Sequence, residues 1–389
     1  MEIIIIGTGM YVSGRGTDGF GTILPAISEF HRRTNLLSKV TVVGTNVQRT
    51  NQASKKFFEL SSLNNVDYPV EFLPSEKNSD ANYISVLKKN KKAHCVIVVV
   101  PDNLHFEVVK NCLLEKKHVL VVKPLTPKIS EAQELIKLAK NNNVYGAVEF
   151  HKRWDKQNRI LFDEFNQGNL GKPLYTWTEY SQRKSIPSKI FKSWVNDNNI
   201  LQYLGTHYID IIRYVTKAKP LEVLAMGQKG WLKDRGFDIH DSIQCFVKWE
   251  LQNGISFNQT LLVNWIDPES TSAMSDQSIK FVGTKGRFEG DQKNRGARLI
   301  YDNKQIEEIN PDFCRPFMNS DDTKSWQGYG IERICSFIED VNKIKAGTKT
   351  PTDFEVEKPS FTESLYSTAV IEKAYDSLLN NSSWEKINI

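Results

Sequence analysis

The first 150 residues alternate short apolar runs with amphipathic stretches. One such stretch, Ile129–Asn141, has its apolar residues at helical spacing, and Ser130 is the expected N-cap. The runs expected as strands are Ile3–Ile6, Val40–Gly44, Val70–Leu73, Cys95–Val100, His118–Val122 and Val144–Phe150. Nearly continuous apolar strands separated by helices are typical of a parallel sheet buried on both faces. The pattern therefore predicts a doubly wound α/β domain over residues 1–150.

From residue 151 the pattern changes to long alternating segments. The expected strands are Tyr175–Ser181, Glu222–Trp231, Ser242–Leu251, Ile255–Trp265 and Ser278–Gly290, and the expected helices are Arg159–Asn166, His207–Val215, Glu332–Lys345 and Phe361–Leu379. Strands that follow one another through turns such as Gln252–Gly254 favour antiparallel pairing. Residues 151–389 are thus expected to form an α/β domain with a large, open, mostly antiparallel sheet, and its last helices are candidates to pack back on the first domain. The segment Asn310–Gly330 has little periodicity and is expected to be a long ordered loop.

Composition narrows the class of protein. The net charge is only +5 over 389 residues, which is too small an excess to indicate a nucleic-acid partner. Five widely spaced cysteines form no CxxC pair, so neither a disulfide framework nor a metal site is predicted. The start of the chain has no basic leader, and the longest apolar run falls far short of the ~20 residues of a membrane span. These features predict a cytoplasmic protein with no membrane partner.

The turn after the first expected strand is the strongest local signal. Gly7-Thr8-Gly9, followed by Met10, allows a tight turn and a close backbone approach to a pyrophosphate, as in Rossmann dinucleotide-binding domains. The third glycine of G-x-G-x-x-G is replaced by Val12. The glycine-rich segment Ser13–Gly21 is interpreted as an insertion that delays the next helix to about Thr22. A plain tight turn is the alternative interpretation of the two glycines.

The second expected strand ends without the acidic residue that binds the ribose hydroxyls of NAD. Thr45 and Asn46 stand there instead, and both can hydrogen-bond a 2′-phosphate, with Arg49 supplying positive charge. The cofactor is therefore predicted to be NAD or NADP, with a preference for NADP. An ordinary surface position on a helix is the alternative for Arg49.

Three further segments occur in a specific order. They are Pro101-Asp102-Asn103-Leu104-His105, then Lys117–Leu125 with its Lys123-Pro124 pair, then Gly205-Thr206-His207-Tyr208-Ile209-Asp210. With Gly168–Pro173 and Phe281–Glu289, the chain resembles the glucose-fructose oxidoreductase/inositol dehydrogenase/rhizopine catabolism (Gfo/Idh/MocA) family over nearly its whole length. The resemblance implies that Pro101, Asn103 and His105 lie beside the cofactor. It also implies that Lys123 reaches both cofactor and reaction centre, where His207 meets it.

Two positions depart from the family pattern. Val122 stands where the family has a glutamate before the lysine, and Tyr203 stands where it has an aspartate four residues before the histidine. A phenol can donate to or accept from a substrate oxygen, so Tyr203 is a candidate replacement, although it lacks a carboxylate's charge. Lys123, His207 and Tyr203 are the predicted catalytic residues.

The residue types suit oxidation of an alcohol. A nicotinamide carries the hydride, and the protein orients the substrate and moves one proton. Histidine side chains titrate near neutral pH, so His207 is the predicted general base, while the charge of Lys123 would stabilise the developing alkoxide. Asp210, one helical turn after His207, is predicted to orient it or to contact substrate, with surface solvation as an equal alternative.

Four consecutive residues after the sixth strand are substrate-binding candidates: His151, Lys152, Arg153 and Trp154. An aromatic ring beside cationic donors suits a sugar or sugar acid. A cluster of salt bridges between domains is the alternative.

The sequence thus predicts an NAD(P)-dependent oxidoreductase acting on a hydroxyl or carbonyl of a sugar, sugar acid or nucleotide sugar. The family resemblance implies a homodimer or homotetramer formed through the C-terminal sheet. Two alternatives remain open: a non-catalytic dinucleotide sensor, and an NAD-dependent glycoside hydrolase. Substrate shape would depend on the loops Arg183–Asn198 and Asn310–Gly330.

Overall fold

The computed structural model describes residues 1–192, 195–197 and 199–389, which form two compact units. The first unit comprises Met1–Thr126, Ser130–Trp154 and Asp312–Ser364. The second comprises Pro127–Ile129, Asp155–Pro311 and Leu365–Ile389. Assignment of residues 1–150 to cofactor binding and 151–389 to substrate binding stays a prediction. Three residues of the expected substrate loop, Ser193, Trp194 and Asn198, lie outside the described residues.

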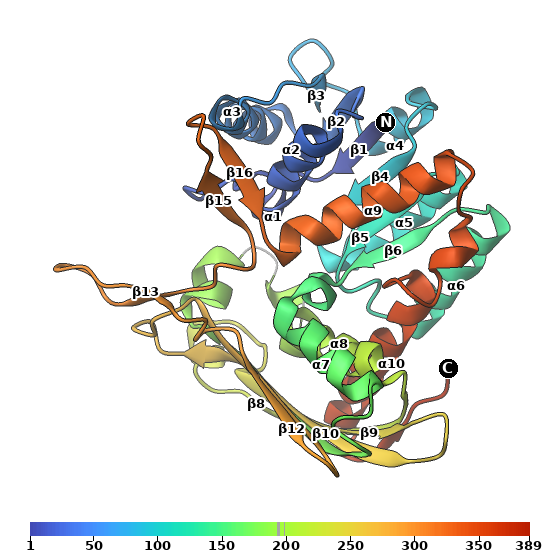
Figure 1. The fold of residues 1–389 in the computed structure, drawn as a ribbon, viewed down its shortest axis with the longest axis vertical. Coiled ribbons are helices and arrows are strands. Elements are labelled where there is room, and N and C mark those ends of the chain that lie inside the picture. The colour runs from blue at the N-terminus through green and yellow to red at the C-terminus, as the bar shows by residue number, and fades with distance from the viewer. Residues whose placement is uncertain (193–194, 198) are drawn as a thin grey trace. The chain divides into compact units, whose positions relative to one another are not determined.

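The first unit is built on a six-stranded parallel sheet of order β3-β2-β1-β4-β5-β6 (Figure 1). The strands are β1 (Glu2–Ile6), β2 (Lys39–Val43), β3 (Val70–Leu73), β4 (Cys95–Val98), β5 (His118–Val122) and β6 (Gly146–Glu149). The helices are α1 (Met10–Ser13), α2 (Ile23–Thr34), α3 (Val47–Asn64), α4 (Tyr83–Lys89), α5 (His105–Leu114), α6 (Ile129–Asn141) and α9 (Tyr329–Lys345). This strand order confirms the predicted doubly wound sheet.

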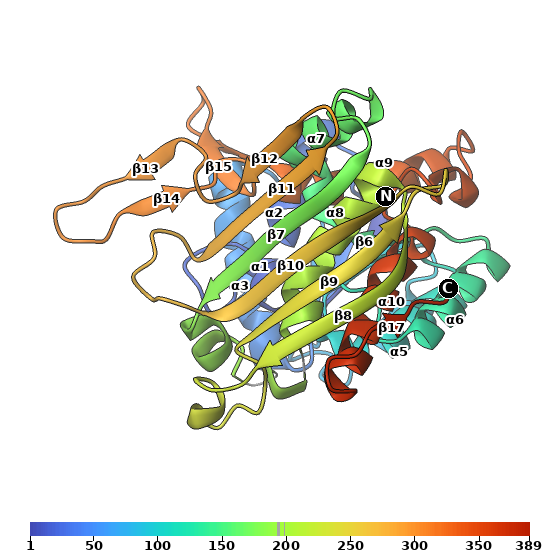
Figure 2. The same ribbon diagram turned by 90° about the horizontal axis from the view of Figure 1, so that it is seen from below.

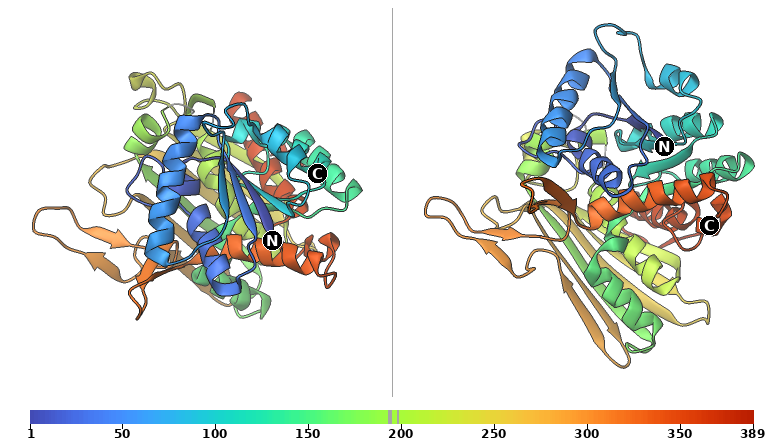
Figure 3. Two further views of the ribbon diagram at one scale, coloured as in Figure 1. Left: turned by 90° about the horizontal axis from the view of Figure 1, so that it is seen from above. Right: turned by 45° about the horizontal axis from the view of Figure 1, so that its top comes forward.

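Alternate residues of each strand face opposite sides, and both sides are apolar. Ile3, Ile5 and Val40 join one core with residues of α2, α3 and α9, whereas α5 packs against β4 and β5. Figure 3 shows helices on both sides of these strands. The insertion Ser13–Gly21 behaves as expected: α1 ends at Ser13, and α2 begins only after Thr22.

Two local predictions in or near this unit are wrong. Ser130 does not cap α6, because the helix begins at Ile129, whose N–H donates to a Glu372 carboxylate oxygen at 2.5 Å. The expected loop Asn310–Gly330 contains a hairpin of β15 (Arg315–Met318) and β16 (Lys324–Gln327). Strands this short show too little alternation to be detected, although Asn319 hydrogen-bonds Thr323 across the turn.

The second unit is built on a seven-stranded sheet of order β12-β11-β7-β10-β9-β8-β17, onto which Figure 2 looks. Its strands are β7 (Pro173–Arg183), β8 (Lys219–Gln228), β9 (Ser242–Glu250), β10 (Ser256–Asp267), β11 (Ser275–Gly283), β12 (Arg287–Asp291) and β17 (Glu385–Lys386); a separate hairpin is formed by β13 (Ala297–Leu299) and β14 (Glu307–Ile309). Its helices are α7 (Lys156–Asn166), α8 (Thr206–Thr216) and α10 (Phe361–Leu379). The prediction of a large, mostly antiparallel sheet is confirmed; within this seven-stranded sheet, of the pairs between described strands only β7 and β10 are parallel.

The expected strand Ser278–Gly290 is in fact two strands. β11 and β12 are joined by a turn in which Gly283 donates its N–H to the carbonyl of Gly286 at 2.8 Å. The helices of this unit lie behind the sheet in Figure 2. Large side chains on the other face, including Trp177, Met226 and Phe246, are between about a third and a half exposed. Assembly through this face stays a prediction.

The five cysteines are free thiols, and four of them are buried. None of the helices in the described ranges has the length and apolar character needed to cross a membrane. The cytoplasmic location stays a prediction.

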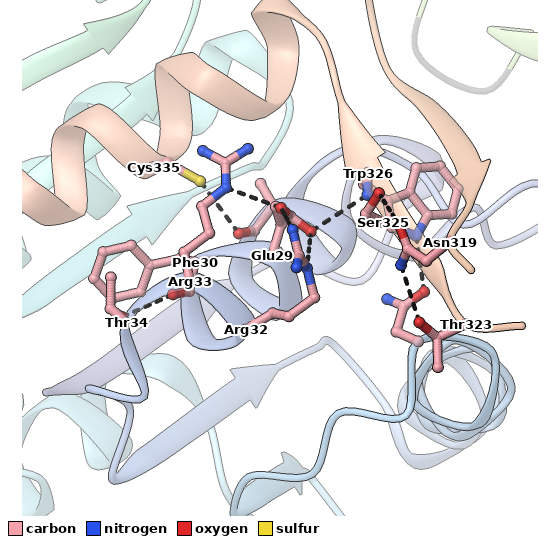
Figure 4. A network of polar contacts seen from close by, with 12 residues as sticks. Glu29, Phe30, Arg32, Arg33, Thr34, Asn319, Thr323, Ser325, Trp326 and Cys335 are labelled. Atoms are coloured by element: carbon pink, nitrogen blue, oxygen red, sulfur yellow. Dashed lines mark hydrogen bonds and ion pairs between the residues drawn. The ribbon is translucent and has the colours of Figure 1, made fainter. Parts of the chain in front are cut away.

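The late hairpin is joined to the early helices by a buried carboxylate, drawn in Figure 4. Glu29 is 2% exposed and accepts hydrogen bonds from Arg32 and Arg33. It also accepts the backbone N–H of Trp326 at 3.3 Å, and the Trp326 indole donates to Asn64 at 3.1 Å. Burial alone would raise the pKa of Glu29, but the hydrogen bonds from the two arginines outweigh it, so the net pKa is lowered.

We expect Glu29→Gln to lower the free energy of unfolding by about 1–3 kcal/mol, because charge-assisted hydrogen bonds are lost in a buried place. The folded carboxyl has a lowered pKa, so its stabilisation is complete above its unfolded value of 4.5 and is lost as the pH falls through the folded value. Urea denaturation at several pH values measures this difference. Glu339→Gln, an exposed carboxylate on α9, is the matched control. Equal stability of the two variants at pH 7 would contradict the assignment.

Candidate functional site

The two glycines after β1 serve different purposes. Gly7 has φ +128°, and a Cβ there would lie 2.1 Å from the carbonyl oxygen of Val99, so close approach of β1 and β4 requires glycine. Gly9 has φ −73°, and a Cβ there would meet no described atom within 4 Å. Neither backbone conformation nor packing within the chain explains glycine at position 9. Open space above this turn fits a group that approaches the backbone closely, as a dinucleotide pyrophosphate does.

The turn itself is held by the residues that follow it. The carbonyl of Thr8 accepts a hydrogen bond from the Ser13 hydroxyl at 3.3 Å and from Nε of Arg15 at 3.0 Å. Thr8 is buried, whereas Met10 is exposed at the start of α1. Residues of the inserted segment therefore stabilise the glycine turn by hydrogen bonds. The sequence did not indicate this role, because the segment lies outside the G-x-G motif.

The residues after β2 form a second group at the same edge of the sheet. Asn46 is the N-cap of α3, and its side-chain oxygen accepts the backbone N–H of Arg49 at 2.9 Å. The Arg49 guanidinium donates to the Thr45 hydroxyl at 3.3 Å. All three side chains are exposed. Arg49 thus points back along its helix toward the strand end, as a residue contacting a bound anion there would.

His105 joins the segments that follow β4 and β5. Its ring is fully buried, with Nδ1 2.7 Å from the carbonyl oxygen of Pro124 and Nε2 3.0 Å from that of Val100. Pro101 and Asn103, on the same turn, are exposed. His105 therefore fixes the backbone beside Lys123, which gives it a positioning role.

Lys123 stands at the carboxyl end of β5 and is half-buried. Burial lowers the pKa of its ammonium group to about 8, and the negative charges of Asp102 and Glu149 limit this shift. A lysine with a pKa this close to neutrality is typical of functional sites. Asp102 and Glu149 were not among the sequence candidates, although Glu149 is the acidic end of an otherwise apolar strand.

The segment after β6 is more enclosed than the sequence indicated. His151, Lys152 and Arg153 are all less than a tenth exposed. The His151 ring bonds both carboxylate oxygens of Glu149, at 2.8 and 3.0 Å, and stacks on Tyr329 of α9.

Trp154 has two cations of its own unit near its ring. The Arg333 guanidinium lies 4.9 Å from the ring centroid, and the Lys358 ammonium lies 5.7 Å from it. These contacts favour packing over sugar stacking for Trp154, whereas the roles of His151–Arg153 stay predictions.

In the second unit, the expected catalytic residues lie at the start of α8. A π-helical turn, Leu201–Gly205, carries Tyr203 and leads directly into α8, which begins at Thr206. Such turns are frequent at functional sites. His207 is buried, with its ring 6.5 Å from that of Tyr180. Asp210 is only 2% exposed, so the alternative of surface solvation is wrong for this residue.

Tyr203 belongs to an aromatic group. Its ring lies 5.0 Å from that of Phe191 and 5.9 Å from that of Trp265. These contacts hold the Tyr203 ring by packing. The aspartate that the family has at this position would instead be held by charge. Among the described residues, no three His, Cys, Asp or Glu side chains are grouped so as to hold a metal ion.

Known proteins similar to this chain are dehydrogenases and oxidoreductases. An uncharacterized oxidoreductase of Schizosaccharomyces pombe is 32% identical over 119 residues, which is 30% of this chain and 32% of that protein. Myo-inositol 2-dehydrogenase of Thermotoga maritima is 25% identical over 228 residues, 55% of this chain and 65% of the other. An NADP⁺-linked scyllo-inositol 2-dehydrogenase of Bacillus subtilis is 28% identical over 116 residues, 30% and 32% of the two chains. These matches span from about a third to just under two thirds of each relative.

Solved structures match over the whole chain, at identities that show the fold alone. A levoglucosan dehydrogenase in complex with NADH and levoglucosan has a TM-score of 0.71 at 16% identity and covers 100% of both chains. Scyllo-inositol dehydrogenase of Lactobacillus casei with bound NAD(H) and scyllo-inositol has a TM-score of 0.67 at 14% identity, over 99% of this chain and 98% of the other.

Two family models complete the comparison. Residues 1–150 match the NAD-binding Rossmann fold of the oxidoreductase family GFO_IDH_MocA, and residues 163–289 match the GFO/IDH/MocA C-terminal domain. With the six-stranded sheet and the glycine turn, these matches confirm the resemblance carried by the motifs. The chain belongs to the Gfo/Idh/MocA family of NAD-binding oxidoreductases.

Proposed function

We propose that this protein is an NAD(P)-dependent dehydrogenase that oxidises a hydroxyl group of a cyclic polyol, sugar, sugar acid or nucleotide sugar, and reduces the corresponding carbonyl in reverse. The observation that carries the proposal is Lys123, a half-buried lysine with a lowered pKa. It lies at the carboxyl edge of the parallel sheet, the same edge at which the glycine turn follows β1. Relatives named as inositol dehydrogenases support the substrate class.

The residues near the glycine turn are proposed to bind the cofactor. They are Gly7, Thr8, Gly9, Met10, Thr45, Asn46, Arg49, Pro101, Asn103 and Lys123, with the buried His105 holding the backbone beside Lys123 in place. Open space at Gly9 supports contact with the pyrophosphate, and the Thr45–Arg49 pair supports a preference for NADP. When bound, the nicotinamide supplies or accepts the hydride.

The protein's side chains are proposed to accept the hydroxyl proton and to stabilise the negative charge that develops on the substrate oxygen. We assign His207 as the base that takes the hydroxyl proton, and Lys123 as the ammonium that stabilises the oxygen as it becomes negative. Tyr203 is assigned a hydrogen bond to the same oxygen. Asp210, His151, Lys152 and Arg153 are assigned to the substrate; the burial of Asp210, one turn after His207, supports its inclusion.

The first experiment is a titration of cofactor-free protein with NADH and with NADPH, followed by nicotinamide fluorescence. Saturable binding is expected, and an inositol and sugar panel is then assayed for NAD(P)H formation. Binding with no turnover on any substrate would favour the sensor. Glycoside cleavage without net change in cofactor would favour the hydrolase. Failure to bind either cofactor would overturn the proposal.

Paired glycine variants test the turn. Gly7→Ala is expected to destabilise the fold by about 2 kcal/mol or more, because the new Cβ meets a backbone oxygen at 2.1 Å and φ is positive. Gly9→Ala is expected to keep the melting temperature but to weaken NADH binding about tenfold or more, because its Cβ occupies only the space reserved for the ligand. Thermal melting and NADH titration separate the two effects. Unchanged NADH affinity in Gly9→Ala would contradict the assignment.

The pH profile tests Lys123. If the ammonium form is required, the rate of alcohol oxidation carries a factor that falls as the pH rises through about 8, the lowered pKa of Lys123. Lys123→Arg stays charged, so this falling limb should move to higher pH in any activity that survives. Lys123→Ala should lose activity about a hundredfold or more while still binding NADH. A falling limb at the same pH in Lys123→Arg would assign it to another group.

A further inference from the structure

The glycine-rich insertion Ser13–Gly21 is a folded element. Gly14 has φ +71°, and a Cβ there would lie 1.9 Å from the carbonyl oxygen of Gly19, so the two ends of the loop touch. Thr17 closes the loop further, since its N–H and its hydroxyl both donate to the Gly14 carbonyl, at 2.9 and 2.8 Å. The loop's path is therefore set by its own backbone.

The loop is also anchored to its surroundings. The Phe20 ring packs edge-on against Trp326 at 6.0 Å, and the Lys56 ammonium lies 5.2 Å above the same ring. At the loop's end, a Cβ on Gly21 would come within 2.6 Å of the Met10 carbonyl oxygen. Trp326 is itself fixed by Glu29 and Asn64. Such anchoring holds a side chain carried by the loop in one place before any ligand arrives.

Arg15 is the cation that this loop carries. Its Nε donates to the Thr8 carbonyl, so the guanidinium is fixed beside the glycine turn. Arg15 also lines a surface hollow with Gly16 and residues of α3. The α3 residues are Gln52, Lys55, Lys56 and Glu59. Three of these six lining residues are cations, which suits an anionic ligand.

Arg49 is a second cation near the glycine turn, although it does not line the hollow; it lies in the first turn of α3 and donates to the Thr45 hydroxyl. Burial, and then the positive charge of Arg49, lower the pKa of the Arg15 guanidinium, as expected for two cations held near each other. Neither forms an ion pair with a carboxylate anywhere in the described parts of the chain. Two uncompensated like charges held near each other are destabilising until an anion lies between them.

We propose that Arg15 and Arg49 together bind the 2′-phosphate of NADP, and that the inserted loop thereby makes this protein select NADP over NAD. The proposal rests on the dinucleotide site proposed above. Guanidinium groups form paired, charge-assisted hydrogen bonds with phosphate oxygens. The expected carboxylate after β2 would repel this phosphate, and Thr45 and Asn46 stand in its place. Arg15 is thus assigned a specificity role that the G-x-G motif does not contain.

Two ligand pairs isolate the 2′-phosphate. 2′,5′-ADP differs from 5′-AMP, and NADPH from NADH, by that group alone. Calorimetric titration should show that wild-type protein binds each phosphorylated ligand at least about tenfold more tightly, and that this ratio falls in higher salt. Arg15→Ala and Arg49→Ala should each reduce the ratio by about tenfold, with little change in the affinity for 5′-AMP.

The controls separate charge from fold. Arg15→Gln removes the charge but keeps a side-chain amide that can donate to Thr8, so it should behave like Arg15→Ala while melting like wild type. Lys137→Ala removes an exposed cation from α6 and should leave the ratio unchanged.

The outcomes distinguish this proposal from the one on which it rests. If NADH and NADPH both fail to bind, the dinucleotide site is wrong, and this proposal falls with it. If both bind equally, or if Arg15→Gln keeps the wild-type ratio, the site stands and the assignment of Arg15 is overturned. Equal weakening of NADH and NADPH in Arg15→Gln would instead place Arg15 at the shared pyrophosphate.

Discussion

The carboxyl edge of the parallel sheet depends on the close approach of two backbones at Gly7. The Gly7 N–H donates to the carbonyl of Val43 at the end of β2, and the Val99 N–H after β4 donates to that of Ile6, both at 2.8 Å. No side chain larger than hydrogen fits between these strand ends. The turns after β1, β2 and β4 therefore converge because main-chain hydrogen bonds bring them together. The polar groups that follow each strand then gather at one edge as a consequence.

The carboxyl edge of the sheet also carries a positive charge, that of Lys123, whose burial costs the folded state free energy. Burial lowers the pKa of Lys123, so the folded state binds its proton less tightly than the unfolded chain does. Stability is consequently reduced at neutral pH, and the loss is recovered as the pH rises from about 8 toward 10.5. Glu149, almost fully buried, is held by the ring of His151. A lysine whose pKa is lowered by burial is typical of a functional site, which is why the proposed reaction is centred on Lys123.

Elements with strong local periodicity were predictable from the sequence. The six parallel strands, α6 and α10 lie where their patterns place them, because buried strands and amphipathic helices are determined by neighbours in sequence. The β15–β16 hairpin was missed, since its four-residue strands are stabilised by contacts such as that of Trp326 with Glu29, almost 300 residues away. The N-cap of α6 was also misassigned because of a contact distant in sequence: the N–H of Ile129, the first residue of the helix, donates to Glu372 of α10.

The residues of the candidate site likewise fall into those that a sequence motif identifies and those that only the folded structure identifies. Gly7, Gly9, Lys123 and His207 belong to short motifs that a reader of the sequence can find. Arg15 has no motif, and its place follows from an insertion folded on Gly14 and anchored by Phe20 to Trp326.

Residues 312–364, which come late in the sequence, also supply a side chain that packs at β6. Arg333 of α9 is completely buried, donates twice to the Val148 carbonyl and lies over the Trp154 ring. Residues 312–364 thus complete the first unit rather than follow it. Family motifs identify the chemistry that this fold supports, whereas the packing around β6 depends on a side chain 185 residues away in the sequence.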